Sequence, residues 1–209
     1  MKTKEKILAK ALELFNQHGS EKVSTRHVAD ALGISVGNLY YHYKDKQALI
    51  EQLYEQLVTT LNGEFDTFEA ADTGLTSLMH SVRFTFDTLH KYRFLMLDFV
   101  QIMRGSSGIK AHYQQLVQLR KEQFRFAVKL LIGQKMLSES IQEVPFDYLQ
   151  MQFTIMGDFW ISEAEILYQG AAADKIKYFT EAMLYWFYPY LTTAGKKVFH
   201  EVLPTLFEK

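Results

Sequence analysis

The chain has 209 residues, of which 48% are hydrophobic and 22% charged, and this composition predicts a folded rather than a disordered protein. It contains no cysteine, which excludes disulfides, thiolate nucleophiles and cysteine-ligated zinc or iron–sulfur sites. Only three prolines and eleven glycines interrupt it, so long helices are favoured over a turn-rich β-sandwich. The most apolar stretch, 94–103, is broken by Asp98 and Gln101, so we expect no membrane span and a cytoplasmic protein.

The net charge of −1 conceals an uneven distribution. Residues 1–50 hold eight Lys or Arg and five Asp or Glu, a net charge of +3, whereas residues 51–209 hold fifteen and nineteen, a net charge of −4. Only four of the thirty aromatic residues lie in the first fifty. We therefore expect two domains, a small basic head at 1–50 and a large aromatic-rich body at 51–209. A mild positive charge is compatible with nucleic-acid binding and also with ordinary variation.

Apolar residues recur at helical spacing along most of the chain, and no segment of more than four residues alternates as a strand. We predict an all-α protein of about nine to ten helices, in which a three-helix N-terminal domain precedes a larger helical domain. The predicted helices span residues 3–18, 25–32, 36–43, 46–62, 74–89, 92–104, 109–132, 147–169, 174–191 and 195–206. The longest irregular stretch is expected at residues 133–146.

The second and third predicted helices have the spacing of a helix–turn–helix. Gly33 can adopt the positive φ of the tight turn, and Ser35 can cap the helix that follows. The exposed remainder of that helix carries amide, phenol and imidazole groups and no carboxylate that would repel phosphate. A helix of this length fits the major groove of DNA. The alternative is a helical hairpin that binds nothing.

The stretch from Thr3 to Ile50 resembles the DNA-binding domain of TetR-type transcriptional regulators. The resemblance covers about a quarter of the chain, and it departs at Tyr43, where the family more often has Phe. The residues that carry it are Ile7, Leu8, Ala11, Leu12, Leu14, Phe15, Gly19, Ser24, Thr25, Arg26, Val28, Ala29, Leu32, Gly33, Ile34, Ser35, Gly37, Leu39, Tyr40, Tyr41, His42, Lys44, Asp45, Lys46, Leu49 and Ile50.

The resemblance implies that the third predicted helix is a recognition helix that enters the major groove of double-stranded DNA. It implies a base-edge contact for Asn38, whose amide suits adenine, and phosphate contacts for Tyr40, His42 and Lys46. Thr25 serves equally well as a plain helix cap. The full set that the resemblance assigns to the DNA interface is Thr25, Arg26, Ser35, Gly37, Asn38, Tyr40, Tyr41, His42 and Lys46.

The resemblance also implies a homodimer formed by the last two long helices, which would build a four-helix bundle across a two-fold axis. Both helices carry apolar rows at spacings of three and four, as such a bundle requires. We expect at least one row to lie in the interface; the alternative is that a row faces only the core of its own subunit. The predicted interface residues are Phe153, Gly157, Trp160, Ala164, Phe179, Met183 and Trp186.

A second apolar side of the 147–169 helix, together with aromatic and Met residues at 74–132, could line a cavity for a bulky apolar ligand. The candidate pocket residues are His80, Arg83, Phe84, Asp87, Asp98, Phe99, Met103, Tyr113, Phe124, Ile155 and Phe159. The alternatives are close-packed core for the apolar members, a solvated face for His80, Arg83 and Asp87, and an internal salt bridge for Asp98. No metal site is expected, because His80 and His90 are ten residues apart.

These observations lead to the hypothesis of a dimeric DNA-binding regulator of bacterial type, most simply a repressor that a small, mainly apolar or aromatic effector releases from its operator. The alternative is a DNA-binding regulator without an effector, whose body serves dimerisation or protein partners. An enzyme is not expected, because the sequence has no phosphate loop, no Gly-x-Ser-x-Gly and no His-Glu-x-x-His. No cofactor is expected.

Overall fold

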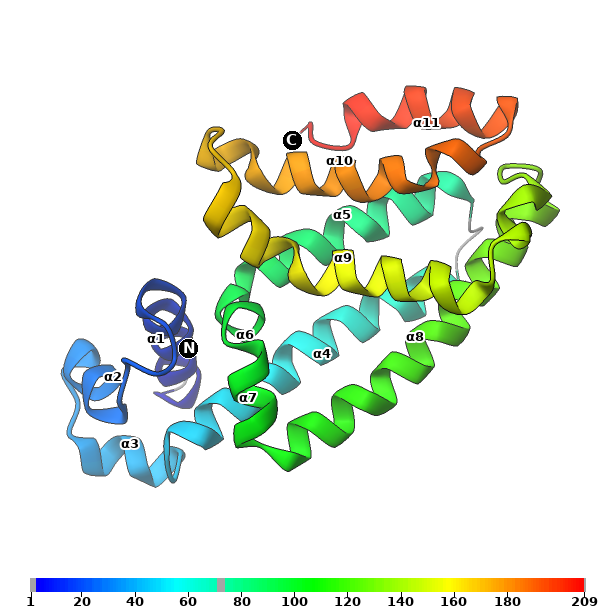
Figure 1. Ribbon diagram of the computed structural model, residues 1–209. Coiled ribbons are helices and arrows are strands. Elements are labelled where there is room, and N and C mark those ends of the chain that lie inside the picture. Colours follow the sequence, from blue (N-terminus) through cyan, green and yellow to red (C-terminus); the bar gives the residue numbers. More distant parts are fainter. Residues whose placement is uncertain (1–2, 71–73, 209) are drawn as a thin grey trace. The chain divides into compact units, whose positions relative to one another are not determined.

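The computed structural model describes residues 3–70 and 74–208. Within these ranges the chain forms eleven α-helices and three short 3₁₀ turns without a strand, which confirms the all-α prediction (Figure 1). The α-helices are α1 (Thr3–His18), α2 (Thr25–Leu32), α3 (Val36–His42), α4 (Lys46–Ala70), α5 (Leu75–Lys91), α6 (Arg93–Leu97), α7 (Phe99–Gly105), α8 (Ser107–Gly133), α9 (Phe146–Leu167), α10 (Lys175–Phe187) and α11 (Thr193–Thr205). The 3₁₀ turns are η1 (Glu139–Glu143), η2 (Ala172–Asp174) and η3 (Tyr188–Tyr190).

Backbone contacts divide the chain into two compact units. The first comprises the residues up to Thr60 together with Lys91–Ala111, and the second comprises Leu61–His90 and the residues from His112 onward. Helices α1 to α3, α6 and α7 therefore belong to the first unit, and α9 to α11 belong to the second. The predicted domain boundary at residue 50 falls inside the first unit, and that division stays a prediction.

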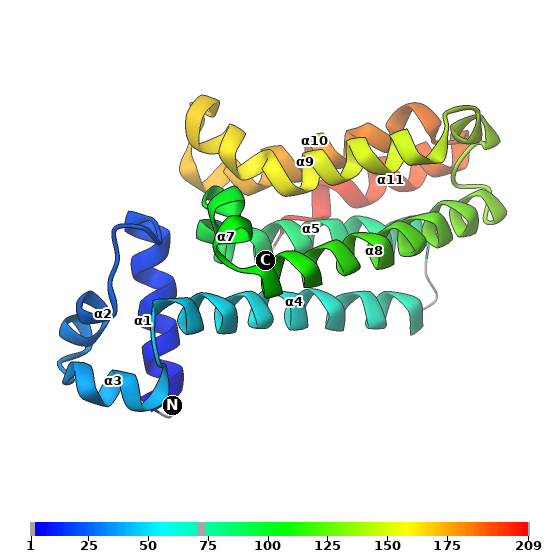
Figure 2. The same cartoon turned by 60° about the horizontal axis from the view of Figure 1, so that its bottom comes forward.

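The first unit contains the three short N-terminal helices (Figure 2). Ile7, Ala11 and Phe15 line one face of α1 and are fully buried, as the helical spacing of these apolar residues requires. The hydroxyl of Ser24 caps α2 by accepting the backbone N–H of His27. Helix α2 ends at Gly33, whose φ of 65° lies in the left-handed region that glycine tolerates. The predicted positive φ of Gly33 is thus confirmed, and the cap of α2 is Ser24 and not Thr25.

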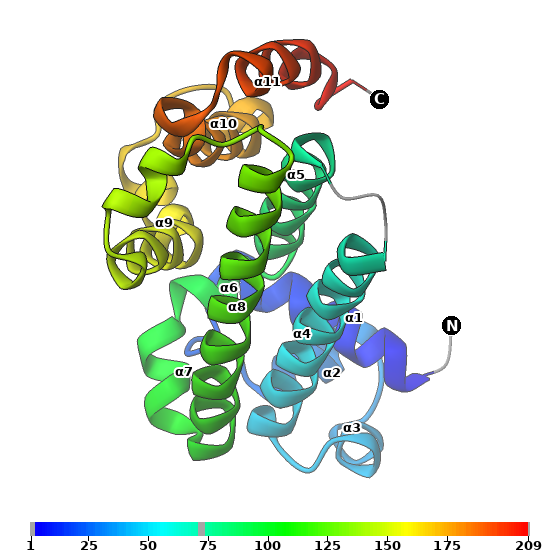
Figure 3. The same ribbon diagram turned by 90° about the vertical axis from the view of Figure 1, so that its right-hand side faces the viewer.

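In the second unit, α9 and α10 run side by side in opposite directions, and α10 lies between α9 and α11 (Figures 1 and 3). The chain crosses from α9 to α10 through the short segment that contains η2. An isolated backbone bridge joins Leu137 to Leu191, and the Met136 carbonyl accepts the N–H of Thr192, so the irregular segment after α8 is fixed to the segment before α11.

Three predicted elements differ from the observed ones by an internal break or by a shift of several residues at one end. The predicted helix 92–104 is two helices, because the chain breaks at Asp98, whose ψ of 15° departs from helical geometry. Helix α4 continues to Ala70, beyond the predicted end at residue 62. Helix α10 ends at Phe187, where η3 begins, since Pro189 lacks an N–H for a continuing α-helix. No helix in the described ranges combines the length and apolarity needed to cross a bilayer.

Candidate nucleic-acid interface

Helix α3 presents its polar residues to solvent and its apolar residue inward. Leu39 is fully buried, whereas Asn38, Tyr40 and Tyr41 are exposed, with Tyr41 at 84%. The hydroxyl of Ser35 caps the helix by accepting the backbone N–H of Asn38 at 3.1 Å. This cap leaves the side chain of Asn38 on the outer surface of the first turn, which is where a recognition helix meets base edges.

Two of the predicted DNA contacts also hold α2 and α3 together. The hydroxyls of Thr25 and Tyr40 lie 3.2 Å apart and share a hydrogen bond, and Thr25 is buried. Thr25 therefore has a structural contact in the free protein, while half of the Tyr40 surface faces solvent. Arg26, the next residue of α2, is exposed. The ring of His42 lies against Tyr41 at a centroid distance of 5.1 Å and is half-buried.

The ammonium of Lys46, predicted to bind a phosphate, has a partner within the chain. Its Nζ donates to the carbonyl oxygen of Ser20 at 2.7 Å and more weakly to that of Glu21 at 3.4 Å. Asp45, the residue before this helix, accepts the backbone N–H of Ala48 with its Oδ1 at 2.8 Å. Lys46 is half-buried at the start of α4, and carbonyl oxygens leave its positive charge unneutralised.

Tyr43, the position that departs from the family pattern, is buried. Burial raises the pKa of its hydroxyl to about 12. The hydroxyl donates to the backbone carbonyl of Lys4 at 3.5 Å, and the ammonium of Lys4 lies 5.5 Å from the centre of the ring. The additional oxygen is thus accommodated at the N-terminal end of α1.

Asp98 was expected in an effector pocket or in a salt bridge, and the structure gives it a different role. Its Oδ2 accepts two hydrogen bonds from Ser20, one from the backbone N–H at 2.8 Å and one from the hydroxyl at 2.6 Å. Asp98 thus lies in the first unit, against the loop between α1 and α2. Ser20 gave no signal in the sequence, since a small polar residue after a helix end is unremarkable.

The remaining predicted pocket residues do not converge on one described cavity. Phe99 and Met103 belong to the first unit, with Asp98. Arg83 and Asp87 form an ion pair at 2.7 Å along α5 and are half-buried, and the Arg83 guanidinium lies 4.6 Å from the centre of the Phe207 ring. His80 is exposed. Phe84, Tyr113 and Phe124 lie in the second unit. Phe84 is half-buried, and the hydroxyl of Tyr113 donates a hydrogen bond to Asp158. Phe124 packs on Phe146 and Phe153.

Asp158 of α9 was missed, although a carboxylate inside the apolar run of that helix was a usable signal. It accepts a short hydrogen bond from the hydroxyl of Tyr113 on α8. Burial raises the pKa of its carboxyl group to about 6, and the Tyr113 hydrogen bond opposes that rise.

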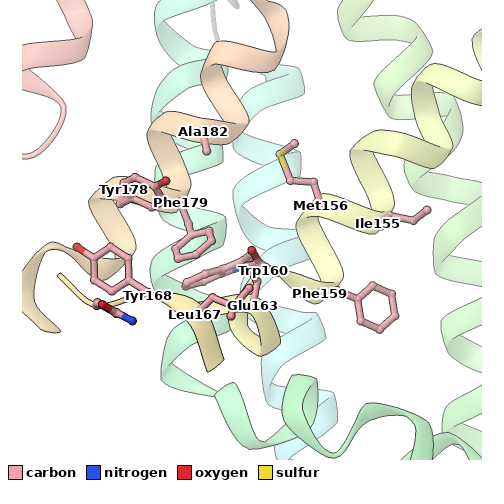
Figure 4. Close-up of a pocket in the computed structure, with 11 residues that line it drawn as sticks. Ile155, Met156, Phe159, Trp160, Glu163, Leu167, Tyr168, Tyr178, Phe179 and Ala182 are labelled. Carbon is pink, nitrogen blue, oxygen red and sulfur yellow. The ribbon is translucent and has the colours of Figure 1, made fainter. Parts of the chain in front are cut away.

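Ile155 and Phe159, predicted to line an effector pocket, lie in an open hollow on the outer side of α9 and α10 (Figure 4). The hollow has a volume of about 700 Å³ and includes the rings of Trp160, Tyr168 and Phe179. Four of the apolar residues that line it are well exposed, namely Ile155, Phe159, Leu167 and Tyr178. Met151, Ile166 and Tyr185 are further exposed apolar residues of the same two helices.

The predicted interface row on α9 is largely internal. Trp160, Ala164 and Met183 are 3%, 2% and 1% exposed within one chain, so they cannot form a surface for a second copy. Gly157 faces the Met183 side chain of its own α10, which explains the small residue there. Phe153 packs on Trp186 and Phe187, and Phe179 packs on Trp160. Helical spacing did not separate this internal row from the exposed apolar side of α9, because both sides are apolar at the same spacing.

Comparison with known proteins places these features in a family. A family model described as a bacterial transcriptional repressor matches residues 45–199, and one described as bacterial regulatory proteins of the tetR family matches residues 7–53. The tetracycline repressor protein class C of Escherichia coli is 41% identical over 56 residues, which are 27% of this chain and 26% of that protein. The probable regulator YttP of Bacillus subtilis is 24% identical over 171 residues, 79% of this chain and 82% of YttP.

A solved structure has the same fold over its whole length. The crystal structure of a TetR-family transcriptional regulator from Marinobacter aquaeolei superposes with a TM-score of 0.85 at 22% identity, and the match covers 99% of both chains. These matches are to transcriptional regulators and not to enzymes.

Proposed function

Because this chain belongs to the TetR family of bacterial transcriptional regulators, we propose that it is a dimeric repressor that a small, mainly apolar effector releases from a DNA operator. The observation that carries the proposal is the outer surface of α3. That surface holds Asn38, Tyr40 and Tyr41 in a capped helix that contains no carboxylate. A bacterial operator lies in the cytoplasm, so we place the protein there.

Asn38 is our candidate for base readout. Its side chain is on the first turn of α3, and an amide can donate to and accept from the major-groove edge of adenine. Gly37 and Ser35 lie beside it and allow the backbone to approach the groove. Tyr41, which is 84% exposed, can reach base edges or phosphates.

The phosphate contacts that we propose flank α3. Arg26 is exposed at the start of α2, and Lys46 keeps its charge at the start of α4. Thr25, Tyr40 and His42 supply hydrogen-bonding groups nearby. Since positioning contacts to the backbone outnumber base contacts, affinity should fall steeply with rising salt concentration.

We propose that a second copy covers the hollow on α9 and α10. The described surface around it presents large apolar side chains such as Ile155, Ile166 and Leu167, with Ile166 at 79% exposure. An exposed apolar surface of this kind is typical of a protein interface. Two copies related by a two-fold axis would present two α3 helices, as an operator with half-sites about 34–36 Å apart requires.

The effector is the finer part of the proposal. The aromatic residues of the second unit favour a bulky apolar ligand, and the partly buried Asp158–Tyr113 pair offers a polar group in the same unit. A ligand of this kind would act by binding one conformation of the dimer more tightly than the other. The alternative function is a regulator without an effector, in which the second unit serves dimerisation or protein partners.

Selection from random double-stranded oligonucleotides with the purified protein tests the DNA-binding part. We expect a palindromic consensus with two half-sites one helical turn apart. The logarithm of the association constant should fall linearly with the logarithm of the salt concentration. Recovery of unrelated sequences with the affinity of random DNA would contradict it.

The effector part needs a separate measurement with the selected operator. Tetracycline and a medium-chain fatty acid, titrated into the protein–operator complex, provide an aromatic and an aliphatic probe. Release at concentrations that also raise the melting temperature of the free protein supports an effector site. A broader compound library without any release would favour the regulator without an effector.

A further inference from the structure

Charged side chains hold Ser20 from two directions. Its backbone N–H and its hydroxyl donate to Asp98, and its carbonyl oxygen accepts from Lys46 Nζ. Ser20 is 4% exposed, so water competes little for these three hydrogen bonds. Hydrogen bonds to charged groups are among the stronger ones in proteins. The loop between α1 and α2 is thereby fixed at one residue.

The Asp98 side chain binds this loop although its position would allow it to cap the nearby N-terminus of α7. It stands at the N-terminal end of α7, where an Asp side chain commonly caps the helix. Here it makes no capping hydrogen bond, and its carboxylate binds Ser20 instead. The side chain of Asn16 supports the same packing, since its amide donates to the Lys91 carbonyl and its oxygen accepts the Phe94 N–H.

The hydrogen bonds continue to the start of α4. Lys46 is the first residue of that helix, and α3 ends four residues earlier, at His42. The series Asp98–Ser20–Lys46 therefore connects the break between α6 and α7 with the segment that directly follows the recognition helix. All of these residues belong to the first unit.

We propose that Asp98 is a positioning residue for operator binding. Through Ser20 it fixes the start of α4, and with it α3, in the geometry that fits the major groove. The inference rests on the proposed function. When a competent arrangement is populated only in part, the apparent dissociation constant rises in inverse proportion to that fraction. Loss of the Asp98 carboxylate should therefore weaken operator binding although Asp98 itself touches no DNA.

The test compares Asp98→Ala, Ser20→Ala and the double variant by titration of the selected operator at one salt concentration. We expect Asp98→Ala to bind roughly five- to twentyfold more weakly, as a reduced competent fraction requires. Ser20→Ala should lose less, because its N–H remains, and it should lose nothing further in the Asp98→Ala background. Asp147→Ala is the matched control, since Asp147 is an exposed carboxylate that pairs with Lys121 in the second unit. It should bind within about twofold of the original protein, as expected for a surface pair.

Hydrogen exchange without DNA provides the second readout. The amide of Ser20 should exchange faster in Asp98→Ala and at the original rate in Asp147→Ala. Unchanged operator affinity in Asp98→Ala, or a full additional loss from Ser20→Ala in the double variant, would overturn the inference. If Asp98→Ala does not fold, Asp98→Asn and Ser20→Ala decide, and normal binding by both overturns it. If the original protein selects no operator at all, the proposed function fails, and the inference about Asp98 fails together with it.

Discussion

Trp160 on α9 stacks on Phe86 of α5, with ring centroids 5.0 Å apart and planes inclined by 17°. The imidazole of His90 lies 6.4 Å from the same indole, and Phe179 of α10 lies 5.4 Å from it. Trp160 therefore joins three helices inside one chain. This contact explains why the most conspicuous aromatic residue of α9 belongs to the core and not to a dimer surface.

Replacing Trp160 with Ala should destabilise the folded chain by about 3–5 kcal/mol, because the surrounding helices cannot close the resulting cavity. Denaturant unfolding followed by circular dichroism measures the change. Phe126→Ala is the control, since Phe126 is an aromatic residue of α8 that is half exposed, and its removal should cost clearly less. Equal losses in the two variants would mean that Trp160 is not a core residue.

Dimerisation should depend on the outer side of α9 and not on the predicted inner row. A charge introduced at Ile155 or Ile166 as Glu should raise the dimer dissociation constant on the order of 100-fold, since the carboxylate would be desolvated in an apolar interface. Sedimentation velocity over a concentration series measures this constant. Leu119→Glu, on the exposed surface of α8, should leave it unchanged. A monomeric original protein, or an intact dimer of Ile155→Glu, would remove α9 from the interface.

Asn38→Ala should weaken operator binding by about 1–3 kcal/mol and relax the base preference at one position of each half-site. The slope of affinity against salt should stay the same, because no charge is removed. Gln142→Ala, an exposed amide in η1, serves as the control. An equal loss of affinity for all DNA sequences would instead indicate that Asn38 contacts the DNA backbone.

The stability of the chain should fall as pH rises from about 4 to about 6, through the contribution of Asp158. Its carboxyl pKa is raised by burial to about 6 in the folded state, against 3.8 in the unfolded state. The folded state therefore binds more protons in this range, and the charged form is disfavoured above it. The difference corresponds to about 3 kcal/mol of lost stability at neutral pH.

Asp158→Asn should remove this pH dependence and unfold at higher urea concentration at pH 7.5, with a smaller advantage at pH 5. Asp147 should change the stability with pH in the opposite direction, because the hydrogen bond and charge of Lys121 lower its pKa. Its stabilising contribution is present above the unfolded pKa and is lost as pH falls. Asp147→Asn removes this contribution. An Asp158→Asn variant with the pH profile of the original protein would show that Asp158 does not titrate in this range.

Gly195, at the start of α11, should not tolerate a side chain. A Cβ at this position would collide with the backbone carbonyl oxygen of Met136, an atom that the Leu137–Leu191 bridge and the Thr192 hydrogen bond hold in place. We expect Gly195→Ala to destabilise the chain by about 1–3 kcal/mol, as overpacking does. Gly63→Ala, inside α4 with open space around it, should instead be neutral or stabilising by up to about 1 kcal/mol. Thermal melting of both variants compares the two effects.

The head of the protein could be predicted almost completely from the sequence. Helices α1 to α3 begin and end at local signals, such as Ser24 and Ser35 at N-termini and Gly33 at a C-terminus, and the partners of these signals lie within a few residues. The inward position of Leu39 and the outward position of Asn38 follow from helical spacing alone. The family pattern rests on the same short-range features.

The sequence by itself determined most of the helices, their order and the exposed polar side of α3, because each depends on neighbours along the chain. Only the tertiary structure decided which apolar side of α9 is internal, since Trp160 and Ile155 belong to rows with the same periodicity and similar hydrophobicity. It also decided the partner of Asp98, which lies 78 residues away at Ser20. Burial and pairing of this kind depend on which surfaces meet in space, and helical periodicity carries no information about that choice.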